Sequence, residues 1–258
     1  MSLVPVLLHI PHSSYVIPPR FWDSFRLRGV ALEREQLRMT DTCTYDLFDL
    51  PCRKVVFPFS RLVCDVERFR DPSQEEMTQR GMWVCYTTTS DMRPLKTVSR
   101  DDREYVLQHY YDKHHAALTR SVADLLERKG KCLIVDCHSF ASRKLPYELH
   151  GGEGKRPDIC IGTDDFHTPP ELARNLADLF TRKGYTVGVN DPFSGALVPL
   201  QYYRKDVRVT SVMIELNRSL YMDEKTGERT GGYVDVQRDI NCIVGDLAGE
   251  DFALLFPY

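Results

Sequence analysis

Three segments of the sequence place a polar side chain at the end of an apolar run or within one. His12 follows the run Pro5–Ile10, His138 follows the run Cys132–Asp136, and Glu215 lies inside a third run. His12 alone could be explained as a loop histidine that is capped by a neighbouring serine. This structural explanation is weaker when a second apolar run is also followed by His-Ser. Polar groups in apolar surroundings are costly unless they are paired or bind something. We therefore predict that the three segments meet at one functional site, beyond the carboxyl ends of strands.

Two neutral imidazoles and one carboxylate can hold a hydrolytic metal ion such as zinc and leave one position open for water. On this hypothesis His12 and His138 are ligands, and Glu215 is the general base that passes a proton from water to the leaving nitrogen. The structural alternative for Glu215 is an ion pair with Arg218. Catalysis is favoured because an acid inside an apolar strand must be ion-paired, metal-linked or held at a raised pKa.

The third metal ligand should be an acid, and the sequence offers three. Asp41 follows Thr40 at the head of a short helical pattern, whereas Asp65 and Glu67 lie together in the segment Cys64–Arg68. The ligands come from separate elements rather than from one local motif, so spacing alone does not choose among them.

Arginines recur near these segments. A guanidinium grips a carboxylate through two parallel hydrogen bonds, so a site with several arginines suits a dicarboxylate substrate. Arg61, Arg68 and Arg218 lie closest in sequence to the proposed site elements. We predict that these three contact substrate, and we add Asp65 from the same segment.

Several classes of function lose support. The sequence contains neither a phosphate-binding glycine loop, nor a dinucleotide-binding glycine motif after a strand, nor a nucleophile elbow, nor a His-Glu-x-x-His helix. Charged residues are 28% of the chain but nearly cancel to a net charge of -3, so nothing attracts it broadly to nucleic acid or an anionic membrane. We expect a small-molecule partner, and the oligomeric state stays open.

Cytoplasmic localisation is the expectation from two further features. The apolar stretch Val4–Ile10 is short, lacks a basic leader and continues into Pro11, so it indicates a buried strand rather than a signal peptide. The eight cysteines are scattered, and several lie in apolar runs, as buried free thiols do in a reducing compartment. His9, inside the first strand, is expected to be a packed core residue.

Short β-type runs alternate with longer helical patterns, which predicts an α/β fold in one domain spanning residues 1–258. The near-continuous apolar strands indicate that both faces of the sheet are covered. The expected strands are Pro5–Ile10, Lys54–Phe57, Arg61–Val66, Cys132–Asp136, Ile159–Gly162, Thr186–Val189 and Val209–Leu216. The expected helices are Thr40–Leu50, Ser99–Lys129, Val234–Leu247 and one that starts with a capping box at Thr168–Glu171. Residues 70–94 and 139–157 are expected to be long, functional loops.

An ordered set of segments resembles the N-formylglutamate amidohydrolase family over nearly the whole chain. The segments are Ile10–Ser14, Thr40–Asp41, Ser60–Arg68, Tyr110–His115, Val135–Ser139, Pro157–Gly162, Asn190–Gly195 and Ile214–Met222. No single segment is diagnostic, but their order is specific. The resemblance implies a fold similar to zinc exopeptidases, a three-layer α/β/α sandwich around a mixed, mostly parallel sheet.

The resemblance also implies a ligand set and a reaction. His12 and His138 match the ligand histidines, Asp41 is the matching acid, and Glu215 matches the base, with one divalent metal ion, zinc, as cofactor. The implied reaction is hydrolysis of N-formyl-L-glutamate to formate and L-glutamate, a late step of histidine catabolism. The arginines would hold the substrate carboxylates.

One residue departs from the family pattern, because Glu67 stands where the family usually has asparagine. An added negative charge beside Arg68 could weaken the grip on an anionic substrate. The alternatives are therefore a metal hydrolase acting on another N-acyl amino acid or a small peptide, and a non-catalytic protein that binds a small acid.

Overall fold

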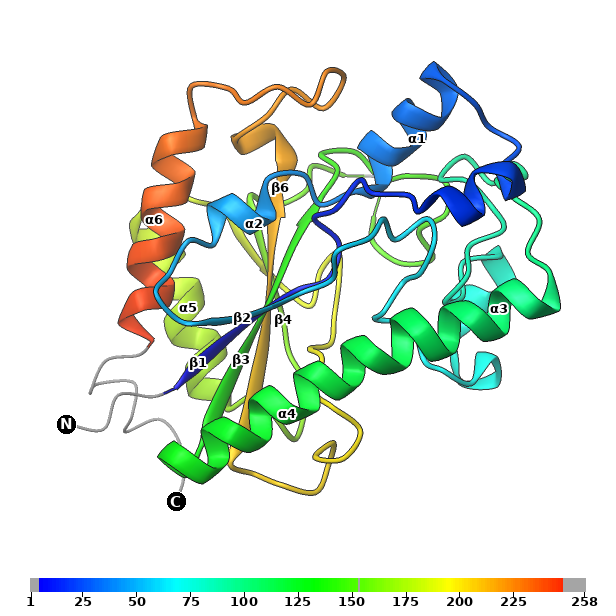
Figure 1. The fold of residues 1–258 in the computed structure, drawn as a ribbon. Coiled ribbons are helices and arrows are strands. Elements are labelled where there is room, and N and C mark those ends of the chain that lie inside the picture. Colours follow the sequence, from blue (N-terminus) through cyan, green and yellow to red (C-terminus); the bar gives the residue numbers. More distant parts are fainter. Residues whose placement is uncertain (1–4, 153, 248–258) are drawn as a thin grey trace.

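The computed structural model describes residues 5–152 and 154–247. The ends of the expected domain, residues 1–4 and 248–258, lie outside the described residues. Within them the chain forms a six-stranded sheet in the order β2-β1-β3-β6-β4-β5 (Figure 1). The strands are β1 (Val6–Ile10), β2 (Arg53–Val56), β3 (Cys132–Phe140), β4 (Ile159–Gly162), β5 (Val187–Val189) and β6 (Val209–Asn217).

Neighbouring strands run parallel, except that β4 is antiparallel to β6. This confirms the predicted mixed, mostly parallel sheet. The longest strands, β3 and β6, pair over nine residues and are buried along their whole length. Both faces of this central pair are therefore covered, as their continuous apolar character predicts.

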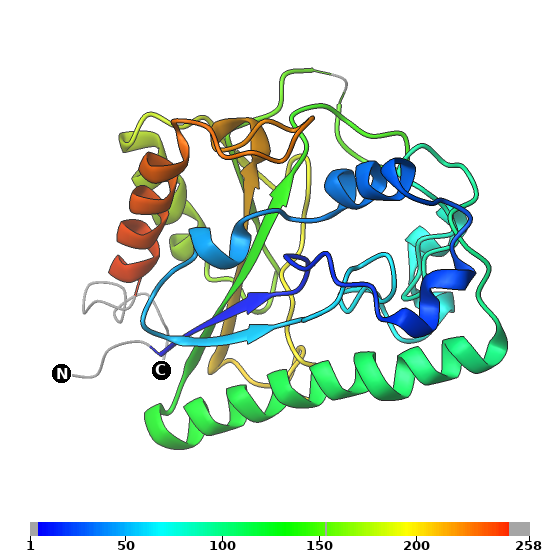
Figure 2. The same ribbon diagram turned by 45° about the horizontal axis from the view of Figure 1, so that its top comes forward.

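Helices cover the sheet on two sides, as Figures 1 and 2 show. The helices are α1 (Val30–Met39), α2 (Thr44–Leu47), α3 (Arg100–Val106), α4 (Asp112–Lys129), α5 (Pro170–Arg182) and α6 (Tyr233–Asp246). Leu8 and Val135 pack with α2, α5 and α6 on one face, whereas Leu7 and Ile134 pack with α4 on the other. Alternate strand residues point to opposite faces, so each strand contributes to both cores of a three-layer sandwich.

The predicted helix Ser99–Lys129 is nearly continuous but contains one irregular turn. Ser99 accepts a hydrogen bond from the Asp102 backbone N–H, and Gly130 ends the helix in a left-handed conformation. Between α3 and α4, Leu107–Tyr111 forms a π-helix.

The helix expected after Thr168 is present, but its predicted capping box is wrong. Pro169 occupies the cap position without a side-chain hydrogen bond, and α5 starts at Pro170. The Thr168 hydroxyl instead donates to the Ser211 carbonyl of β6. Thr168 therefore ties the start of α5 to the sheet rather than to its own helix.

The segment Arg61–Val66 was expected to be a strand, and this prediction is wrong. It forms turns in a second apolar cluster, where Leu62, Val63 and Cys64 are fully buried. Its apolar residues are thus buried by loops and by α3 rather than by a sheet neighbour. The sequence also gives no prediction of α1, which buries only Glu35 and Met39.

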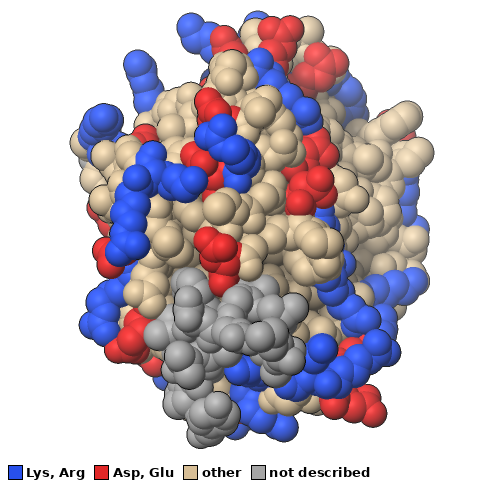
Figure 3. All heavy atoms as spheres, turned by 90° about the vertical axis from the view of Figure 1, so that its left-hand side faces the viewer, with Lys and Arg blue, Asp and Glu red and all other residues tan. Residues whose placement is uncertain are grey.

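The surface carries both charge signs. Figure 3 shows basic and acidic side chains spread over the face that includes α6, in line with the small net charge. No helix among the described residues is long and apolar enough to cross a membrane.

Candidate active site

The parallel strands bring the predicted site residues to one face of the sheet. In the register of β3 and β6, His138 lies opposite Glu215. In the register of β1 and β3, His9 lies opposite Asp136. Since every second residue of a strand shares a face, His138 and Asp136 both point to the side that α4 covers.

His12, Asp41 and His138 form a group of three buried ligand atoms that lie within 4.8 Å of one another. Asp41 Oδ2 is 3.6 Å from His12 Nδ1 and 3.0 Å from His138 Nδ1. Two ligands of a tetrahedral zinc ion with bonds of about 2.0 Å are roughly 3.3 Å apart. His12 Nδ1 is also buried without a hydrogen-bond partner. The donor set and its spacing therefore fit a divalent cation.

Asp41 is held in place from two sides. Its backbone N–H donates to the His12 carbonyl, at 3.0 Å. Its Oδ1 accepts from Arg218 Nη2 at 2.9 Å. Although burial alone would raise the pKa of the Asp41 carboxyl, the adjacent His12 and His138 rings more than offset this and hold the pKa well below its ordinary value.

Asp65 lies behind His12, on the side away from Asp41. Its Oδ1 is 2.9 Å from His12 Nε2, and its Oδ2 accepts from Arg61 Nη2 at 2.9 Å and from the Tyr86 hydroxyl. Burial raises the pKa of Asp65, but nearby His12 and arginines more than offset it and keep the carboxyl well below its usual range. A hydrogen bond to Nε2 leaves Nδ1 of His12 as the free ligand atom.

Glu67, the third acid considered, sits at the wall between the group and solvent. Its Oε1 is 3.0 Å from His138 Nε2, and its Oε2 is 3.6 Å from His12 Nδ1. It lines the cleft described below, whereas the fully buried Asp65 does not. Glu67 thus adds a negative charge directly beside the two histidines.

Arg218 makes hydrogen bonds to other groups of the protein and does not form an ion pair with Glu215. Its Nε donates to Ser139 Oγ at 3.0 Å, and its Nη1 donates to the Arg38 carbonyl at 2.6 Å. Its Nη2 holds Asp41. The structural alternative for Glu215, a pair with Arg218, is therefore not formed.

Glu215 is buried, and its Oε2 has no hydrogen-bond partner within the described chain. Burial raises the pKa of Glu215 to about 7, although the nearby His138 opposes this rise. An acid with a pKa near neutrality, facing a cavity, is suited to accept and release a proton.

The group opens into a cleft of about 970 Å³. Its lining includes the predicted residues His12, Asp41, Arg61, Arg68, His138, Glu215 and Arg218. Apolar side chains such as Leu145, Phe193 and Met213 complete the wall, together with Tyr147. The two long loops predicted to be functional both contribute to this lining, the first through Gln74 to Met77 and the second through Ala141, Leu145 and Tyr147 to Gly151.

Sequence reasoning did not assign a role to Asp136, His9 or His114. His9 is fully buried, as expected, but its ring is hydrogen-bonded to Asp136 and His114. A signal for Asp136 was present, since it stands two residues before His138 and so shares its face of the strand.

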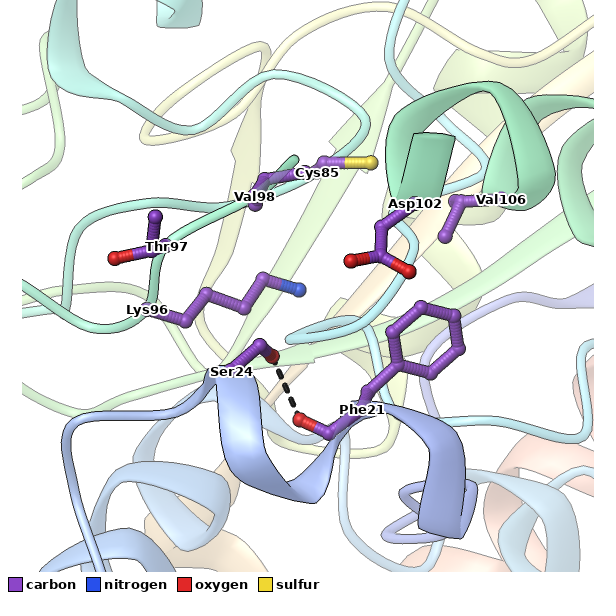
Figure 4. A pocket seen from close by; sticks show the side chains of 8 residues that line it. All are labelled: Phe21, Ser24, Cys85, Lys96, Thr97, Val98, Asp102 and Val106. Atoms are coloured by element: carbon purple, nitrogen blue, oxygen red, sulfur yellow. Dashed lines mark hydrogen bonds between the residues drawn. The ribbon is translucent and has the colours of Figure 1, made fainter. Parts of the chain in front are cut away.

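A second cavity, of about 10 Å³, lies away from the site. Figure 4 shows the Lys96 amine directed between Cys85 and Asp102. Lys96 is buried, donates to the Leu62 and Val63 carbonyls, and lies over the Phe25 ring. This cavity is too small for a substrate and belongs to the packing of the second apolar cluster.

Several known proteins are similar to this chain in sequence or in fold. An N-formylglutamate deformylase from Pseudomonas putida is 28% identical over 86% of this chain and 83% of its own. The crystal structure of an N-formylglutamate amidohydrolase from Ralstonia eutropha JMP134 superposes with a TM-score of 0.81 at 25% identity, covering 96% of this chain and 94% of its own. A gene product of Agrobacterium tumefaciens shares the fold, with a TM-score of 0.68 at 20% identity over 98% of this chain and 92% of its own. A model described as N-formylglutamate amidohydrolase matches residues 4–222, and the chain therefore belongs to this family.

Proposed function

We propose that this chain is a metal-dependent amidohydrolase that cleaves N-formyl-L-glutamate to formate and L-glutamate. The observation that carries the proposal is the group His12, Asp41 and His138, which has an unpartnered His12 Nδ1 and opens into the same cleft as Glu215. The family membership and the name of the Pseudomonas relative support the choice of substrate.

We propose His12, Asp41 and His138 as the ligands of one divalent ion, with zinc as the first choice because two imidazoles and a carboxylate suit it. When bound, such an ion polarises the amide carbonyl and lowers the pKa of water. Asp65 would act by fixing the His12 ring, and Arg218 by fixing Asp41, rather than by touching substrate.

Glu215 would be the general base. Its unpartnered Oε2 can accept a proton from the attacking water, and its near-neutral pKa allows it to return the proton to the leaving nitrogen. The departing amine of glutamate then leaves in neutral form.

Arg61 and Arg68 would bind the substrate carboxylates. Both line the cleft, and each places one nitrogen beside Asp65 Oδ2, with Arg61 Nη2 at 2.9 Å and Arg68 Nε at 3.3 Å. An arginine offers five N–H groups, so others remain for a substrate carboxylate.

Glu67 favours a second candidate substrate. Its carboxylate lines the cleft beside His138 and would repel an anion placed there. An N-acyl amino acid with an uncharged side chain avoids this repulsion, so the same machinery would then act on a neutral analogue.

The test is formate release from N-formyl-L-glutamate and from its neutral isostere N-formyl-L-glutamine. The purified protein is assayed after metal removal and again after zinc, cobalt or manganese is restored. We expect metal-dependent release that is faster for the glutamate compound. Faster release from the glutamine compound would favour the neutral substrate, and no turnover with any metal would leave only a binding protein.

A further inference from the structure

Three buried side chains behind the metal group, His114, His9 and Asp136, form a hydrogen-bonded chain that ends against His138. His114 Nε2 lies 2.8 Å from His9 Nε2. His9 Nδ1 lies 2.7 Å from Asp136 Oδ1, and the same oxygen is 3.2 Å from His138 Nε2. All four side chains are at most 6% exposed.

We propose that His114, His9 and Asp136 fix the ring of His138 with its Nδ1 turned toward Asp41, and so set the affinity of the metal site. This inference rests on the proposed metal-dependent function. None of the three residues touches substrate, so they are positioning residues.

The directions of the hydrogen bonds follow from Asp136. An ionised carboxylate only accepts, so His9 Nδ1 donates to Asp136. His138 Nε2 faces two carboxylate oxygens, Glu67 Oε1 as its hydrogen-bond partner at 3.0 Å and Asp136 Oδ1 at 3.2 Å, so this nitrogen carries the proton. His9 Nε2 is then the acceptor for the N–H of His114 Nε2. With its proton at Nε2, His138 keeps the lone pair on Nδ1, which is the atom 3.0 Å from Asp41 Oδ2.

The same residues could be taken for a second metal site, because His9, Glu67 and Asp136 also converge. The distances favour hydrogen bonds. The 2.7 Å between His9 Nδ1 and Asp136 Oδ1 is a hydrogen-bond length and is short of the roughly 3.3 Å between two ligands of a tetrahedral ion.

The fold shows a specific adjustment at the far end of the chain. The π-helix Leu107–Tyr111 comes directly before α4, and His114 lies in the first turn of α4. Single π turns inside helices occur frequently at functional sites. Here it directly precedes the turn from which His114 reaches His9, and the Phe57 ring contacts His114 edge-on with the ring centroids 5.4 Å apart.

The segment Tyr110–His115 contains none of the proposed metal ligands. Its role in this proposal is to supply His114 as the partner of His9. The Asp136 carboxylate is held on both oxygens, since His9 Nδ1 donates to Oδ1 and the Leu197 backbone N–H donates to Oδ2 at 3.3 Å. His9 is the side-chain donor on the oxygen that faces His138. His114 in turn satisfies the other nitrogen of His9, which would otherwise be a buried unpaired acceptor.

The experiment compares His9→Leu with His9→Asn, whose amide can replace the N–H at Nδ1. The control is His167→Leu, which removes an equally buried histidine that is bonded only to the Val209 carbonyl and the Arg204 N–H. The readouts are zinc affinity by competition with a chromophoric chelator, zinc content by elemental analysis, and the visible absorption of the cobalt-loaded protein.

We expect His9→Leu to weaken zinc binding about tenfold or more, the scale for an outer partner of a metal ligand. His9→Asn should restore most of that loss, and His114→Leu should have a smaller effect of the same sign. His167→Leu should keep wild-type affinity even where it lowers thermal stability.

Three results would overturn the inference. Wild-type zinc affinity in folded His9→Leu would remove His9 from the chain, and equal losses in His9→Leu and His9→Asn would assign the effect to packing. Two zinc ions in the wild type, one of them lost in His9→Leu, would make His9 a metal ligand. A wild type that binds no metal and releases no formate would defeat the proposed function as well.

Discussion

Glu215 is an acid whose surroundings disfavour its charged form. Glu215→Gln keeps the shape of the side chain but cannot accept a proton, so we expect a loss of at least roughly a hundredfold in formate release. Zinc content should not change, because Glu215 is not in the ligand group. Undiminished activity would make Glu215 structural, and a loss of zinc would make it a ligand.

The same substitution should stabilise the metal-free protein. Burial raises the pKa of Glu215 to about 7, so the folded state favours the protonated form. The stability that this preference contributes is complete below the unfolded pKa, near 4.5, and is lost as the pH rises through 7. We therefore expect Glu215→Gln to gain stability over the wild type between pH 5 and pH 8 in urea unfolding. Parallel pH curves for the two proteins would contradict this.

Glu67 and Arg68 have opposite charges beside the proposed substrate position. Glu67→Gln removes a repulsion at constant volume, so we expect KM for N-formyl-L-glutamate to fall roughly five- to tenfold, the size of about 1 kcal/mol or slightly more. Arg68→Ala should raise that KM. For N-formyl-L-glutamine, both substitutions should change KM much less. Equal changes in KM for the two compounds would show that Glu67 and Arg68 do not interact with the side-chain carboxylate of the substrate.

At the scale of elements, the strands that carry the site could be predicted, and the segment Arg61–Val66 could not. A near-continuous apolar run such as Leu62 to Cys64 indicates burial, but a strand also needs a neighbour for its backbone groups. Here the Leu62 and Val63 carbonyls accept from Lys96, and the Asp65 N–H donates to Val84. A hydrogen-bond partner more than 30 residues away in sequence, such as Lys96, cannot be inferred from the local pattern of the segment.

Lys96 makes this arrangement sensitive to pH. Its burial lowers the pKa of the amine to about 8, so between pH 8 and its unfolded value of 10.5 the unfolded state holds more protons. Stability should then rise with pH in this range and be lost as the pH falls through 8. Relative to Lys96→Met, the wild type should gain about 2 kcal/mol between pH 7.5 and pH 9.5.

Urea unfolding of both proteins in reducing buffer measures this difference, since the remaining titrations are common to the two chains. A constant difference across the pH range would show that the amine is as well solvated in the fold as in the unfolded chain. A shift of opposite sign would mean that the Leu62 and Val63 carbonyls stabilise the ammonium more than burial destabilises it.

At the scale of the whole molecule, the sequence predicts which segments meet but not which atoms face each other. His12, His138 and Glu215 could be placed because each ends or interrupts an apolar run. The choice of Asp41 over Asp65 depends on which side of the His12 ring each acid occupies. That geometry comes from loops whose conformation has no periodic pattern.

The ligand group joins parts of the chain that are far apart in sequence, from residue 12 to residue 138, so a bound ion would act as a crosslink of the fold. An ion that binds only the folded state stabilises it by about 2.7 kcal/mol at a hundredfold excess over its Kd. For a chain of this size that corresponds to a rise in Tm of roughly 5–10 °C. We expect this rise when zinc is added to the metal-free protein, as measured by calorimetry.

His138→Ala separates this linkage from non-specific effects of zinc. The variant lacks one of the three proposed ligands, so its Tm should be nearly independent of zinc, and its zinc content should fall. Glu215→Gln, which retains the ligands, should keep the full zinc-dependent rise. If all three proteins respond equally, zinc binds elsewhere; if only the wild type responds, Glu215 takes part in holding the ion. In the expected pattern, the same three side chains support catalysis and also connect residues 12–41 to the central strand β3.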